Sequence, residues 1–103
     1  MPFYNHTTTL SNASEATVGT VGSGKVWVII GANAANTGAA SNDITLKVAS
    51  KHVVKSAPVP AGSALSVLDG KIIAEAGDTV TAQSSNSSGE FDVIVSILEQ
   101  DQS

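Results

Sequence analysis

Residues 63–99 read SALSVLDGKIIAEAGDTVTAQSSNSSGEFDVIVSILE, and this stretch decides the fold. It consists of short apolar segments, rich in β-branched residues, with turn residues between them. Segments of this length and composition are typical of β-strands. The turn pairs that separate them are Asp69-Gly70, Gly77-Asp78 and Ser88-Gly89. Asp69-Gly70 is a two-residue hairpin signal, so we expect Ser63–Leu68 and Lys71–Glu75 to pair with each other.

The rest of the chain continues the pattern. Lys25–Asn33 is the most apolar strand, and it places Trp27 on one of two apolar faces, where we expect either the sandwich core or a neighbouring subunit to bury it. Asp43–Ala49 and Phe91–Glu99 alternate apolar and polar residues, which is typical of strands with one buried face. Strands recur at intervals of about eight to twelve residues and no helical period is present. The sequence therefore predicts an all-β, antiparallel two-sheet β-sandwich, with jelly-roll or immunoglobulin-like connections.

Composition limits the possible partners. The chain has 103 residues, enough for one domain, and no cysteine, which excludes disulfides and thiolate metal sites. Its net charge is −4, with five lysines and no arginine to neutralise phosphates, so we expect no nucleic-acid partner. The longest apolar run, Val26–Ile30, is far too short for a membrane span, and the first ten residues lack the basic and apolar regions of a signal peptide.

The N-terminal fifteen residues differ from the remainder. Residues 1–15 are Thr-rich and polar after two aromatic residues, so we interpret them as an extended arm that precedes a sandwich domain at residues 16–103. Aromatic side chains in a polar arm have no core of their own, and such residues often anchor interfaces. The alternative is that the arm folds back on its own domain. The predicted partner-binding residues of the arm are Pro2, Phe3, Tyr4, His6 and Leu10.

Candidate catalytic motifs are weak. Gly19–Lys25 matches the spelling of a phosphate-binding loop, but a strand follows it instead of the helix whose amides would hold the phosphates. The only histidines, His6 and His52, lie 46 positions apart, and no GxSxG nucleophile turn occurs. Asp69 and Asp78 fit turns, where such side chains bond nearby amides. We therefore expect no catalytic residues, no metal site, no cofactor and no enzymatic activity.

The layout resembles a group of small virion proteins, of about a hundred residues, from tailed bacteriophages. The resemblance rests on the Thr-rich N-terminal segment and on five runs: GSGKVWVI (22–29), PVPAG (58–62), LSVLDGK (65–71), AGDTV (76–80) and VIVS (93–96). It implies a β-sandwich structural protein that acts as capsid cement, also called a decoration protein. Such a protein would bind the major capsid protein on the virion surface, as a homo-oligomer (dimer or trimer), after assembly in the host cytoplasm. No catalytic residues come with the resemblance.

Two other functions remain open at this point. The same fold would serve a neck, tail or fibre-adaptor subunit of the virion, and the sequence does not separate these from a capsid protein. A carbohydrate-binding module on a host-recognition structure is a further alternative. With 4% aromatic residues, the chain offers few aromatic faces for sugars to stack on.

Overall fold

The computed structural model describes residues 3–66 and 71–101, which form nine strands and no helix. Five of them make one antiparallel sheet, in the order β1, β9, β3 and then β6 and β7, which both pair with β3. We call this the first sheet. Its strands are β1 (Phe3–Leu10), β3 (Lys25–Asn36), β6 (Ala64–Ser66), β7 (Ile72–Glu75) and β9 (Phe91–Asp101).

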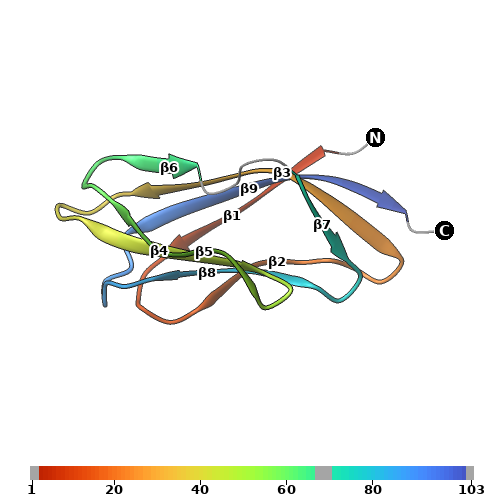
Figure 1. Cartoon of the computed structure of the whole chain (residues 1–103), viewed down its shortest axis with the longest axis horizontal. Coiled ribbons are helices and arrows are strands. Elements are labelled where there is room, and N and C mark those ends of the chain that lie inside the picture. Colours follow the sequence, from red (N-terminus) through yellow and green to blue (C-terminus); the bar gives the residue numbers. More distant parts are fainter. Residues whose placement is uncertain (1–2, 67–70, 102–103) are drawn as a thin grey trace.

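The other four strands make the second sheet, which is antiparallel in the order β2, β8, β4, β5. Its strands are β2 (Ala16–Thr20), β4 (Asn42–Val48), β5 (Lys51–Val59) and β8 (Thr79–Ser84). The two sheets lie one above the other in an elongated molecule of 46 × 21 × 18 Å (Figure 1). None of the described segments is a helix that is long and apolar enough to cross a bilayer.

The connections decide between the two predicted topologies. When β6 and β7 are counted as one interrupted strand, the described residues form eight strands. The outermost pair in the sequence is β1 with β9, followed inward by β2 with β8, β3 with β6 and β7, and β4 with β5. A long hairpin rolled into two sheets has this pairing, which is the jelly-roll arrangement. The prediction of an all-β two-sheet sandwich is confirmed, and its connections are those of a jelly roll.

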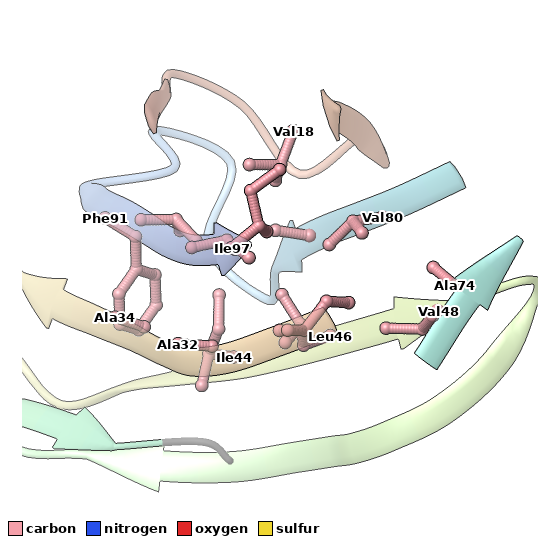
Figure 2. Packing of buried hydrophobic residues seen from close by; sticks show 14 of the residues in the cluster. Val18, Ala32, Ala34, Ile44, Leu46, Val48, Ala74, Val80, Phe91 and Ile97 are labelled. Carbon is pink, nitrogen blue, oxygen red and sulfur yellow. The ribbon is translucent and has the colours of Figure 1, made fainter. Parts of the chain in front are cut away.

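The core lies between the sheets and is built from alternate residues of the strands (Figure 2). On β4 the inward residues Ile44, Leu46 and Val48 are at most 7% exposed, as their alternation with polar residues predicts. The alternate residues of β9 that begin at Phe91 are likewise buried. Trp27 of β3 is 2% exposed, so it belongs to the sandwich core, the first of its two predicted environments.

The predicted hairpin around residues 69–70 is wrong. Segments β6 and β7 both run antiparallel to β3, β6 beside Asn33–Ala35 and β7 beside Val26–Ile29. They therefore point in the same direction, whereas the strands of a hairpin point in opposite directions. The turn pair Asp69-Gly70 itself lies outside the described residues. The other predicted turn role is confirmed, because the Asp78 carboxylate accepts a hydrogen bond from the Glu75 amide at 2.9 Å.

The expected N-terminal arm is also not what the structure has. Phe3–Leu10 is strand β1, which pairs with β9 along its whole length, from Phe3 opposite Leu98 to Leu10 opposite Phe91. The segment is mostly polar because β1 is an edge strand, and of its side chains only Leu10 is buried in the core. The alternative considered from the sequence, that this segment folds back on its own domain, is the observed arrangement.

Candidate docking surface

The outer face of the first sheet carries a row of apolar side chains across four strands. Phe3 of β1 lies opposite Leu98 of β9, Leu98 lies opposite Val28 of β3, and Val28 lies opposite Ile73 of β7. Residues directly opposite each other in antiparallel strands point to the same side of the sheet. Their neighbours Trp27, Ile29 and Ala74 point into the core, so these four point outward.

A bulge adds a fifth residue to this row. The pairing of β3 with β9 shifts register between Ile29 and Gly31, which leaves Ile30 without a partner residue on β9. A β-bulge of this kind redirects a side chain relative to the regular pleat. Ile30 is 43% exposed, while Phe3 is 65% exposed and Ile73 is 58% exposed. We call Phe3, Val28, Ile30, Ile73 and Leu98 the apolar row.

The apolar row ends at the β1 side in a shallow hollow of about 250 Å³. Its lining includes Phe3, Ile30 and the polar pair Asn5 and Ser96, whose side chains are joined by a 2.7 Å hydrogen bond. Large apolar side chains and a small polar rim are common features of protein–protein contacts. The hollow is an available recess for a side chain of a partner.

Most of the remaining outer surface of both sheets is polar. Beyond Asn5 and Ser96, the outer face of the first sheet carries Thr7 and Thr9, and the Thr9 hydroxyl donates to Asp92 at 2.8 Å. Ile94 is 41% exposed in this region. The second sheet has a corresponding polar row on its outer face, which consists of Thr17, Thr81, Lys47 and His52. The apolar row therefore distinguishes one face of the sandwich from the other.

The five residues predicted to bind a partner do not form one surface. Phe3 belongs to the apolar row, whereas Tyr4, the next residue of β1, points to the other side of the strand and is 48% exposed. His6 stacks on the Trp27 indole, with ring centroids 4.6 Å apart. Leu10 is 3% exposed and is part of the core, so in this fold it is not accessible to a partner. Pro2 lies outside the described residues.

The other members of the apolar row were not identified from the sequence. Val28, Ile30 and Ile73 lie on strands that are apolar on both faces, and nothing local shows which of the two faces is covered. Leu98 lies on the face opposite the predicted core residues of its strand, but nothing local shows that it joins the other three. The signal that was available is the double apolar face of Lys25–Asn33, because a strand with two apolar faces must have a neighbour on each.

The opposite flank of the sandwich is open between the edge strands of the two sheets. A cavity of about 760 Å³ lies there, lined by residues of β5, β6 and β7. The apolar part of its lining includes Val53, Val54, Leu65 and Ile72, and the polar part includes His52. Among the described residues, no group of three or more His, Asp or Glu side chains is placed to hold a metal ion.

Two ion pairs join segments of the chain at the surface. Lys25 at the start of β3 bonds Asp101 at the end of β9, and this contact raises the pKa of Lys25 and lowers the pKa of Asp101. Lys47 lies 3.1 Å from Glu15, and the hydrogen bond between them is the main cause that lowers the pKa of Glu15. Neither pair lies in the apolar row.

Comparisons of the chain with protein-family models, curated proteins and solved structures return no match.

Proposed function

We propose that this protein is a structural subunit that docks onto another protein through the apolar row, and that it serves as a decoration protein on a bacteriophage capsid. The observation that carries the docking role is the apolar row itself, five large apolar side chains that lie side by side on an outer sheet face. Single exposed apolar residues are ordinary, but a contiguous patch indicates an interaction site.

The nature of the partner comes from the resemblance to small virion proteins of tailed phages. In this proposal the major capsid protein covers the apolar row, and the sandwich lies on the outside of the shell. A protein that binds only the mature lattice stabilises that lattice by mass action. Many copies, each with a modest interface, would then resist the pressure of packaged DNA. The jelly-roll fold supports this proposal, since capsid proteins are among its common uses.

The first experiment is to measure how many copies of this chain a purified particle contains. Quantitative mass spectrometry against the major capsid protein gives the ratio directly. A copy number comparable to that of the shell subunit is the expected result. A small fixed number would overturn the capsid assignment and place the protein in the neck, the tail or a fibre adaptor. Absence from the particle would overturn the virion function.

The second experiment tests the apolar row. Phe3→Asp and Ile73→Asp each place a charge in its exposed part, and we expect either to weaken binding to particles at least about tenfold, because each buries a charge against an apolar contact. Both side chains are largely exposed, so the substitutions leave the core intact. Thr17→Asp is the matched control, since Thr17 is exposed on the outer face of the second sheet. Equal binding of all three variants would refute docking through the apolar row.

A further inference from the structure

A two-sheet sandwich has open sheet edges, and an unprotected edge can pair with another chain. Proteins prevent this with lysines, prolines, bulges or short strands at their edges. The β5 edge of the second sheet has several of these features. It carries Lys51, Lys55 and Pro58, its pairing with β4 shifts register twice, and Ser56 has a φ of 52°.

Two further edges are protected by shortness or irregularity. Strand β2 is five residues long, and its pairing with β8 shifts between Thr17 and Gly19. On the far edge of the first sheet, β6 has three residues and β7 has four. Within residues 3–66 and 71–101, neither edge offers a long, regular row of backbone groups to another strand.

Strand β1 is different from these three edges. Its eight residues pair with β9 in continuous register, without a bulge. It contains no lysine, no acidic residue and no proline, and Phe3, Tyr4, Asn5, Thr7 and Thr9 are exposed. A long, flat and uncharged edge strand is the type of edge that pairs with another strand. Protection at three edges and its absence at the fourth indicate that the β1 edge has a partner.

We propose that this partner is β1 of a second copy of the chain, paired antiparallel about a two-fold axis. Charge does not oppose a second copy at this edge. The chain carries a net charge of −4, but β1 contains no Lys, Asp or Glu, so two β1 strands bring no like charges opposite each other. The central residues Asn5, Thr7 and Thr9 are short and polar, and such residues form favourable pairs across strands.

Symmetry limits the possible register. A two-fold axis between antiparallel strands of one sheet is perpendicular to that sheet, so the outer face of one copy continues into the outer face of the other. Residues opposite each other must then both point outward or both point inward. Two registers pair most of β1: Phe3 opposite Thr9, with His6 on the axis, or Tyr4 opposite Leu10, with Thr7 on the axis.

The dimer would also change how the chain docks onto a capsid. This step rests on the proposed function. Both apolar rows lie on the same side of the joined sheet. They are offset along the strands by six to eight residues, which corresponds to about 20–27 Å at the usual rise per residue of a strand. Two sites on one rigid body bind a repeating lattice more tightly than one site does. The dimer would thus bridge neighbouring capsid subunits, whereas a monomer would bind only one.

The absence of cysteine allows a direct test. Single cysteines at Asn5, His6, Thr7 and Thr8 report on the two-fold axis, because a cysteine near the axis forms a disulfide with its own copy under mild oxidation. We expect a covalent dimer at one or two adjacent positions of β1 and none with the control Thr17→Cys on the β2 edge. Cross-linking of the control at a level equal to the β1 variants would overturn the proposal.

Light scattering after size exclusion measures the same equilibrium without a cross-link. The wild-type chain should be a concentration-dependent dimer. Thr7→Lys should lower its dimer affinity at least tenfold, and Thr17→Lys should leave it unchanged. A wild-type chain that stays monomeric at millimolar concentration overturns the dimer. If such a monomer is still abundant on particles, the proposed function stands without the dimer. If the chain forms the dimer but is absent from particles, the dimer stands and the proposed function is overturned.

Discussion

Gly89→Ala is the most informative test of how the β8–β9 loop is packed. Gly89 has a φ of 73°, in the left-handed region that favours glycine. A Cβ atom at this position would overlap the carbonyl of Leu10 and would lie 2.5 Å from the Ser11 amide nitrogen. Both are backbone atoms, so no side chain can rotate away to make room.

The hydrogen bonds around Gly89 set the size of the effect. Its carbonyl accepts bonds from the Ser84 hydroxyl at 2.7 Å and the Asn42 amide at 2.8 Å, and both of these side chains are buried. The next amide, that of Glu90, donates to the Leu10 carbonyl at 2.9 Å. An added methyl group must push the loop away from β1 and thereby break at least one of these bonds. A buried polar group left unsatisfied costs about 1–3 kcal/mol, and the left-handed backbone costs alanine about 1–2 kcal/mol.

We therefore expect Gly89→Ala to lower the free energy of unfolding by about 2–5 kcal/mol. Gly62→Ala is the matched control, because Gly62 has a φ of 72° and nothing within 4 Å of its added Cβ. Its cost should be about 1–2 kcal/mol, from the backbone alone. Urea unfolding at 25 °C measures both values, and thermal unfolding should show Gly89→Ala lower in Tm by about 8–25 °C. If the two variants cost the same within about 0.5 kcal/mol, the close approach of Gly89 to Leu10 is not real.

The other predictions concern the same loop and the surface charges. Ser84→Ala removes a buried hydroxyl and leaves the Gly89 carbonyl with one bond fewer, so it should cost about 1–3 kcal/mol in urea unfolding. The control Ser87→Ala, at an exposed position of the same loop, should cost less than about 1 kcal/mol, and equal costs would contradict the buried network. The pKa of Glu15 is lowered by Lys47, so the stabilisation from this pair is present above the ordinary pKa of the carboxyl and is lost as the pH falls through the lowered value. Glu15→Gln should therefore reduce the loss of stability on acidification, measured as Tm against pH, and an unchanged acid slope would show that the pair does not persist in solution.

The strands and their buried faces were predictable because the responsible signal is local. A side chain in a strand points to the face opposite to its neighbours, so the alternation in Asp43–Ala49 and Phe91–Glu99 identifies the core residues without knowledge of the pairing. The predicted inward residues of both strands are buried, namely Ile44, Leu46, Val48, Phe91, Val93, Val95 and Ile97. Turn chemistry was reliable at Asp78 for the same reason, since it concerns backbone groups three residues away.

Pairing partners were not predictable, because a strand's partner depends on the whole chain. Residues 63–75 have the local pattern of a hairpin, yet both of their strands add to β3, which offers an unpaired edge of sufficient length. Phe3–Leu10 has the composition of an arm, yet β9 provides eight continuous partners for it. In both places a favourable pairing with a distant strand outweighs what the local sequence indicates.

The sequence by itself thus determined that this protein is an all-β sandwich with a core of alternating residues, because strand period and turn chemistry act over a few residues. Only the tertiary structure decided that the connections are those of a jelly roll and that β1 is an edge strand. It also decided the apolar row, whose members Phe3 and Leu98 are 95 positions apart in the chain. Register across β1, β9, β3 and β7 places these side chains together, and register is a property of the assembled sheet.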